Sequence, residues 1–172
     1  EPADRIHAVR QKFLSEFVPH FENAYSAISD EAESPAIRYK SHLNETQMAD
    51  VLSQQLDKDR ILERTSRGIH KDDLEFELNG FETKLYGSQG QIKSFVIALK
   101  LASYTYLHAH IGTRPLLLLD DIFEKIDAGR AARLLKLISN GIYGQIFITD
   151  TERDRVHEAL RDIDKDKVDL ML

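Results

Sequence analysis

Residues 115–124 read PLLLLDDIFE, and this stretch decides the expected fold. Four leucines between a proline and two aspartates predict a strand buried on both faces, as in the middle of a parallel sheet that helices cover on both sides. The carboxyl end of this strand would bring Asp120 and Asp121 to the rim of the sheet, where open α/β folds bind ligands. A strand followed by an acidic helix start explains the same residues equally well, because aspartate favours the positive end of a helix dipole.

The pattern of the remaining residues extends this α/β prediction. Pro19 lies inside the first helical pattern and should kink or divide it, whereas Asn79-Gly80 predicts a hairpin turn and Gly112 a helix end. Alternating strands and helices in the second half imply a parallel sheet with right-handed crossovers. We expect helices over residues 4–28, 46–56, 91–110, 129–139 and 152–160, and strands over 37–41, 74–78, 81–86, 115–119 and 145–149.

The composition excludes several classes of protein. The 172 residues contain no cysteine, which rules out disulfides and thiolate metal sites and fits a reducing compartment such as the cytoplasm. No apolar run approaches the ~20 residues of a membrane span, so we expect no membrane partner. A net charge of −6 argues against a generally basic surface for nucleic acids. Lys93, Arg130, Arg133 and Lys136 could still form a local basic patch, although such residues more often make up a solvated face.

A second informative segment is YGSQGQIK, residues 86–93, which precedes the long helix expected over 91–110. Backbone amides and a hydroxyl at the positive end of a helix can receive an anion, and a phosphate above all. The alternative is an ordinary helix cap, in which Ser88 or Gln91 only satisfies the first free amides of the helix. This segment by itself favours the ordinary cap.

Taken together, the segments resemble the ABC-type ATPases that act on DNA, the SMC, Rad50 and RecF group, with the strongest likeness to the RecF family. Residues 64–76, RTSRGIHKDDLEF, look like the RecF pattern of Arg-Thr followed by Gly-Pro-His-Arg-Asp-Asp and a strand. Ser-Gln-Gly-Gln replaces the transporter sequence Leu-Ser-Gly-Gly-Gln. The likeness is strong over residues 64–160 and weaker before them. Departures from the RecF pattern are Ile69, Lys71 and Asp150, the last of which puts the switch contact in doubt.

The resemblance implies an α/β lobe of the P-loop NTPase type, with a mostly parallel sheet and an amino-terminal helical arm. It implies that Asp120 holds Mg²⁺ through water, that Asp121 orients or deprotonates the attacking water, and that Thr149 occupies the switch position. ATP bound by the opposite subunit would be contacted by the signature residues and by the loop that crosses between subunits. These residues are Ser88, Gln89, Gly90, Gln91 and Asp127.

The resemblance also predicts two parts of the chain, and it draws attention to a motif that the sequence lacks. Residues 1–62 would form the helical arm, and residues 63–172 the carboxy-terminal half of the lobe, with the signature, Walker B, D-loop and switch segments. A phosphate-binding P-loop needs Gly-x4-Gly-Lys-Ser/Thr, yet no two glycines are five residues apart. The first residue is not methionine. We therefore expect the back portion of a longer protein, which hydrolyses ATP negligibly by itself.

In the intact protein, the resemblance implies an ATP-dependent homodimer with DNA-dependent ATPase activity. Such a protein would act in the bacterial cytoplasm on single-strand gaps or junctions during DNA repair, recombination, replication and the SOS response, and would help mediator proteins to load recombinase. One alternative is a transporter or SMC-type ATPase head; a transporter would carry Glu at position 121 and His near Thr149. Another is a non-catalytic interaction module, in which Asp120 and Asp121 merely cap a helix.

Overall fold

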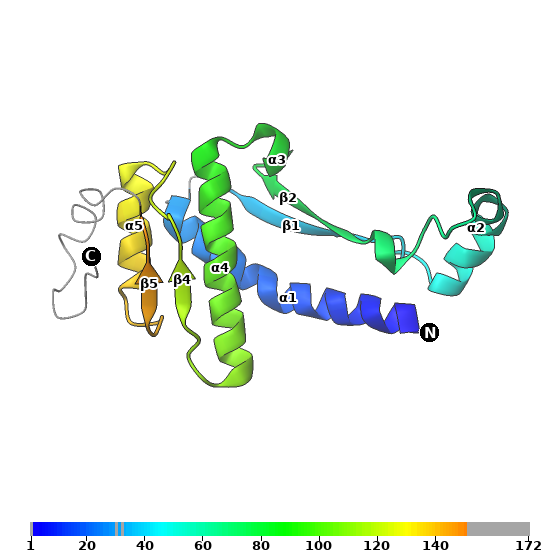
Figure 1. The fold of residues 1–172 in the computed structure, drawn as a ribbon, viewed down its shortest axis with the longest axis horizontal. Coiled ribbons are helices and arrows are strands. Elements are labelled where there is room, and N and C mark those ends of the chain that lie inside the picture. Colours follow the sequence, from blue (N-terminus) through cyan, green and yellow to red (C-terminus); the bar gives the residue numbers. More distant parts are fainter. Residues whose placement is uncertain (1, 30, 32, 151–172) are drawn as a thin grey trace.

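The computed structural model describes residues 2–29, 31 and 33–150, and it shows a lobe from which an arm extends (Figure 1). The lobe contains a two-stranded parallel sheet, in which Leu118 lies opposite Phe147. The expected α/β architecture is thereby confirmed. The elements of the lobe are α4 (Gln89–Ile111), β4 (Leu117–Leu119), α5 (Ala128–Ile138) and β5 (Ile146–Ile148).

The arm is built on an antiparallel sheet of strand order β1-β2-β3, in which Tyr39 lies opposite Leu74. The long strands β1 and β2 run beside helix α1, and α2 lies at the end of the arm farthest from the lobe (Figure 1). The elements are α1 (Pro2–Ser29), β1 (Pro35–Lys40), α2 (Met48–Leu62), the 3₁₀ turn η1 (Ile69–Lys71), β2 (Asp73–Leu78), β3 (Phe81–Glu82) and α3 (Thr83–Tyr86).

The structure corrects two local predictions, and a third falls outside the described residues. Helix α1 is continuous through Pro19, so the predicted division there is wrong, because tertiary packing along its second half outweighs one lost backbone hydrogen bond. The expected return strand over 81–86 stops after Glu82 and becomes the helical turn α3, where Leu85 and Tyr86 are exposed and find no face to bury. The helix expected over 152–160 lies outside the described residues.

The hydrophobic core lies where the second half of α1 crosses α4 (Figure 1). The tilted rings of Phe21 and Phe95 pack there with centroids 4.6 Å apart, and both side chains are buried. The apolar stripe that predicted α1 is buried only over this half, since Ile6 and Val9 are exposed where the helix runs out along the arm. The apolar stripe therefore predicted the helix correctly, but it did not predict which half of the helix packs into the hydrophobic core.

The leucine strand is buried on one face only. Leu117 and Leu119 are 5% and 1% exposed, whereas Leu116 and Leu118 are 62% and 63% exposed. The prediction of a strand buried on both faces is wrong for the described part of the chain, because the helices there cover a single face of the β4–β5 sheet. The other face leaves Leu116 and Leu118 exposed, and contiguous exposed apolar side chains are typical of an interaction surface.

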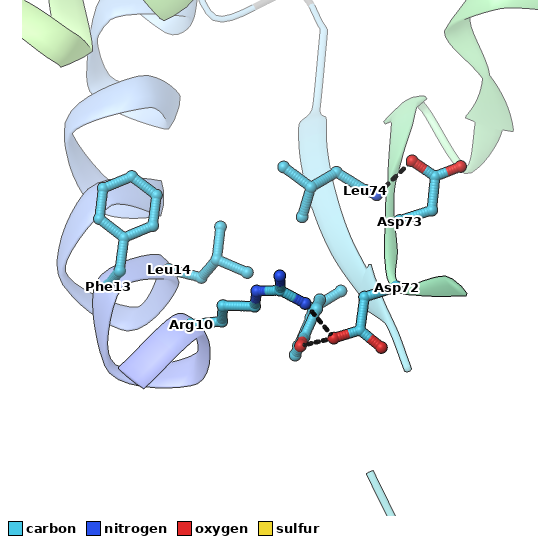
Figure 2. A pocket seen from close by; sticks show the side chains of 7 residues that line it. Arg10, Phe13, Leu14, Asp72, Asp73 and Leu74 are labelled. Atoms are coloured by element: carbon cyan, nitrogen blue, oxygen red, sulfur yellow. Dashed lines mark hydrogen bonds and ion pairs between the residues drawn. The ribbon is translucent and has the colours of Figure 1, made fainter. Parts of the chain in front are cut away.

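Residues 64–76, which carry the RecF-like pattern, are held against α1 by hydrogen bonds of Asp72. The Asp72 side chain is only 4% exposed. Arg10 Nη1 lies 2.6 Å from Asp72 Oδ2, and the Tyr39 hydroxyl donates to the same oxygen. Figure 2 shows this contact at the edge of a pocket that Phe13 and Leu14 also line. These hydrogen bonds outweigh burial and lower the pKa of Asp72, so that a charged carboxylate ties the start of β2 to α1.

Candidate functional site

Asp120 and Asp121, which we call the acidic tip, follow β4, and Thr149 follows β5. Because the two strands are parallel, these residues meet at one edge of the sheet. The Thr149 hydroxyl donates to Asp120 Oδ1, and the backbone N–H of Asp121 donates to the Thr149 carbonyl at 2.9 Å. Asp120 and Thr149 are both exposed. The structure thus brings together the three residues expected to hold metal and to act on water.

Asp121 has an unusual environment within this edge. Its backbone adopts the left-handed conformation (φ 52°), and its Oδ1 is sealed from solvent without a hydrogen-bond partner in the described part of the chain. The pKa of Asp121 is raised, first by a side-chain hydrogen bond shared with the Glu124 carboxyl and then by burial and the Glu124 charge, against the opposing charge of Lys93. A carboxylate with a raised pKa is a better proton acceptor near neutral pH.

The donor set at this edge suits a largely hydrated Mg²⁺ ion. Asp120 presents an exposed carboxylate, whereas the described residues contain no group of three His, Asp or Glu side chains able to form a protein cage. Mg²⁺ commonly takes one or two carboxylates and fills its remaining positions with water and phosphate oxygens. Asp120 can therefore serve such an ion without further protein ligands.

Residues 87–91, which we call the signature turn, begin helix α4. The Ser88 hydroxyl accepts a hydrogen bond from Gln91 N at 3.2 Å, and Gln91 Oε1 accepts one from Ser88 N at 2.8 Å. This is a reciprocal capping box, so the ordinary-cap interpretation describes the local geometry correctly. Ser88 and Gln89 nonetheless remain exposed at the positive end of a 23-residue helix. The turn is preorganised and open to an anion.

The signature turn packs against the loop that follows the acidic tip. A Cβ atom at Gly90 would lie 3.1 Å from the Lys125 carbonyl oxygen, closer than most side chains tolerate. Asp127 ends this loop as the cap of α5: its Oδ1 accepts from Arg130 N at 2.9 Å, and that backbone hydrogen bond lowers the pKa of Asp127. Residues 122–127, which we call the crossing loop, thus lie between the acidic tip and α5.

Sequence reasoning missed Glu33 and misplaced Arg130. Arg130 Nη2 is 2.9 Å from Glu33 Oε1, and the two side chains are 14% and 10% exposed. Arg133 Nε donates to the Ile28 carbonyl at 2.8 Å in a partly buried position. The sequence left open a basic patch and favoured a solvated face, and neither describes these two arginines, because both are turned into the lobe. A single acidic residue in a loop carries no local signal of such a distant partner.

The solved structures that resemble this chain define its class. The structure described as that of the recombination mediator protein RecF with ATP in the RecFOR pathway superposes with a TM-score of 0.69 at 25% identity, covering 88% of this chain and 42% of that one. The SMC head domain of Pyrococcus furiosus shares the fold at a TM-score of 0.56 and 16% identity, over 91% of this chain and 33% of that one. The fold is accordingly that of the P-loop NTPase heads of the RecF and SMC type.

Curated relatives narrow the class to a family, although no family model matches the chain. The DNA replication and repair protein RecF of Flavobacterium johnsoniae is 44% identical over 156 residues, which make up 91% of this chain and 44% of that protein. Its counterpart in Parabacteroides distasonis is 46% identical over 90% of this chain and 42% of its own length. The chain belongs to the RecF family. It spans less than half the length of the curated relatives it matches.

A membrane-spanning role has no support in the described residues. None of the helices there combines the length and the apolar character that crossing a bilayer requires.

Proposed function

We propose that this chain is the carboxy-terminal ATPase portion of a RecF protein, with a helical arm or insertion over residues 1–62 and half of the nucleotide-binding lobe over residues 63–172. In this division, β2 and β3 belong to the second part of the chain and complete the antiparallel sheet of the arm. Its acidic tip would serve the ATP of its own subunit, and its signature turn the ATP of a partner subunit. The contact of Gly90 with the Lys125 carbonyl carries this proposal, because it holds the exposed turn beside the loop that follows the tip.

At the acidic tip, Asp120 would hold Mg²⁺ through water. When bound, that ion would neutralise charge on the phosphate oxygens. Asp121, with its raised pKa, would orient the attacking water and accept its proton. Thr149 donates to Asp120 and would keep that carboxylate turned toward the nucleotide.

The signature residues Ser88, Gln89, Gly90 and Gln91, together with Asp127, would contact the ATP that the opposite subunit holds. Each composite site then needs two subunits. ATP shared in this way binds only the closed dimer and stabilises it by mass action.

The bare face of the β4–β5 sheet supports the need for a further portion. Leu116 and Leu118 are exposed there, and Phe147 of β5 is 36% exposed. A polypeptide with the P-loop that this sequence lacks would cover such leucines. We therefore expect the 172-residue chain alone to hydrolyse ATP negligibly.

For the whole protein, we propose action on DNA at single-strand gaps or junctions in the bacterial cytoplasm, where it would help mediator proteins to load recombinase. The names of the relatives support a role in replication and repair, and the similar solved structure is described as a recombination mediator in the RecFOR pathway. Participation in the SOS response is part of the same proposal.

The test compares Ser88, the cap of helix α4, with Ser103 within that helix, in a protein that also carries the amino-terminal portion of RecF. Ser88→Arg fills the signature turn, whereas Ser103→Arg places the same side chain at another exposed position of the helix. We expect Ser88→Arg to abolish ATP-dependent dimerisation in analytical ultracentrifugation while ATP binding by each monomer persists, and Ser103→Arg to behave as wild type. ATP-dependent dimers of undiminished stability with Ser88→Arg would refute the proposal.

A further inference from the structure

A buried ion pair lies between the signature turn and the crossing loop. Arg130 Nη2 is 2.9 Å from Glu33 Oε1, with little of either side chain exposed. The Tyr25 hydroxyl donates to the other carboxylate oxygen, Glu33 Oε2, at 2.7 Å, and Tyr25 is itself fully buried. Buried charges are tolerated only where partners satisfy them, so the position of this pair is well defined.

Two hydrogen-bonded routes connect the pair to the signature turn. Gln91 Nε2 donates to Glu33 Oε1 at 2.6 Å. Arg130 Nη1 donates to Ser94 Oγ at 3.2 Å, and that hydroxyl donates to the Gly90 carbonyl at 2.8 Å. Arg130 thus reaches two successive residues of the turn, each through one intermediate side chain.

The same guanidinium holds the end of the crossing loop. Arg130 Nε lies 3.2 Å from Asp127 Oδ2, while the Arg130 backbone N–H donates to Asp127 Oδ1. Burial opposes the charge on Glu33, but hydrogen bonds from Gln91, Tyr25 and Arg130 outweigh it and lower the pKa of Glu33. The pair therefore remains ionised at neutral pH.

We propose that Glu33 and Arg130 are positioning residues that lock the signature turn and the crossing loop into one rigid unit, so that both meet the ATP of the partner subunit together. This inference rests on the proposed function. Without the pair, each loop would have to be ordered separately when the dimer closes. The population competent to close would fall, and the apparent affinity would fall with it.

The experiment uses the protein that carries the amino-terminal RecF portion, with Glu33→Gln and Arg130→Met. We expect each substitution to weaken ATP-dependent dimerisation by roughly 5- to 150-fold, the usual range for coupled binding sites. The kcat should fall as well, because each composite site forms only in the dimer. The Kd of each monomer for a fluorescent ATP analogue should stay unchanged, because the P-loop is untouched. The double variant should lose less than the sum of the single effects, since both residues act in one network.

Asp72→Asn is the matched control, because Asp72 is also a buried carboxylate that accepts from an arginine and a tyrosine, but it lies at the start of β2, beside helix α1. It should lower thermal stability without weakening dimerisation. Equal losses of dimerisation in Asp72→Asn and Glu33→Gln would overturn the proposal, as would wild-type dimerisation in Glu33→Gln and Arg130→Met while Ser88→Arg abolishes it.

Hydrogen exchange of the nucleotide-free protein separates this inference from the proposed function. In Glu33→Gln, backbone amides of the signature turn and of the crossing loop should lose protection together. If only one of the two loops loses protection, or neither does, the proposal of a rigid unit is refuted, irrespective of whether the protein dimerises with ATP. If both loosen but the wild type does not dimerise with ATP, the proposed function fails and the mechanical link between the loops stands.

Discussion

Substitution of two adjacent leucines of β4 tests the proposal that a further portion of the protein packs on the exposed face of the parallel sheet. Leu119 is 1% exposed and Leu118 is 63% exposed, so alanine at each position removes the same atoms from opposite faces. In the 172-residue chain, Leu119→Ala should lower the free energy of unfolding by roughly 2–5 kcal/mol, as expected for a packed leucine. Leu118→Ala should change it by no more than about 0.5 kcal/mol, as expected for a surface position.

Packing of the amino-terminal portion of RecF on the exposed face should increase the loss of stability caused by Leu118→Ala. Complete burial of a leucine side chain is worth about 1.5–3 kcal/mol. Because 63% of Leu118 is exposed, roughly two-thirds of that value, or about 1–2 kcal/mol, remains to be gained when the amino-terminal portion packs on the sheet. Urea unfolding can be followed by circular dichroism in the presence and in the absence of that portion. At constant m value, the shifts in the unfolding midpoint give the loss of unfolding free energy for Leu118→Ala and for Leu119→Ala. Equal costs for Leu118→Ala and Leu119→Ala in the chain alone would refute the reasoning.

Three further outcomes follow from the structure. Asp72→Asn should lower the free energy of unfolding by roughly 1–3 kcal/mol in thermal or urea unfolding, because it weakens charged hydrogen bonds to a carboxylate that is 4% exposed. Pro19→Ala should raise that free energy by up to about 3 kcal/mol, since α1 is continuous there; a loss of stability would contradict this. Glu124→Gln should lower the pKa of the Asp121 carboxyl in an NMR titration, because it removes the neighbouring charge and shared proton that raise it, and an unmoved titration curve would exclude Glu124 as the cause. In the complete ATPase, the acidic limb of the pH–rate profile should shift to lower pH in the same variant.

Acid should also loosen the contacts around Glu33 and Asp72. The pKa of each carboxyl is lowered in the folded chain, so its contribution to stability is present above the ordinary carboxyl pKa and is lost as the pH falls through the lowered value. Unfolding free energies measured between neutral and acidic pH should decline. Glu33→Gln should flatten that decline, and an unchanged pH dependence in this variant would contradict the assignment.

The sequence by itself determined the elements whose signals are local. Alternation predicted the strand over 74–78, and a mostly apolar run ended by Gly112 predicted the helix over 91–110, which the structure shows as α4. The leucine run predicted that Asp120 and Asp121 would lie at the rim of a sheet, and the resemblance to RecF added Thr149. In the structure these residues share one sheet edge, because parallel strands end on the same side. The distinctive order of these segments also led to the RecF family, which the curated relatives bear out.

Only the tertiary structure decided which faces are covered and which charges are buried. Leu118 and Leu119 are identical neighbours in the sequence, and they differ in exposure because, within residues 2–150, helices pack on one face of the sheet alone. Glu33 and Arg130 are 97 positions apart, and nothing local marks them as partners. Their pairing depends on how α1, α4 and α5 meet, since burial and long-range hydrogen bonds are properties of the packed chain and not of any segment within it.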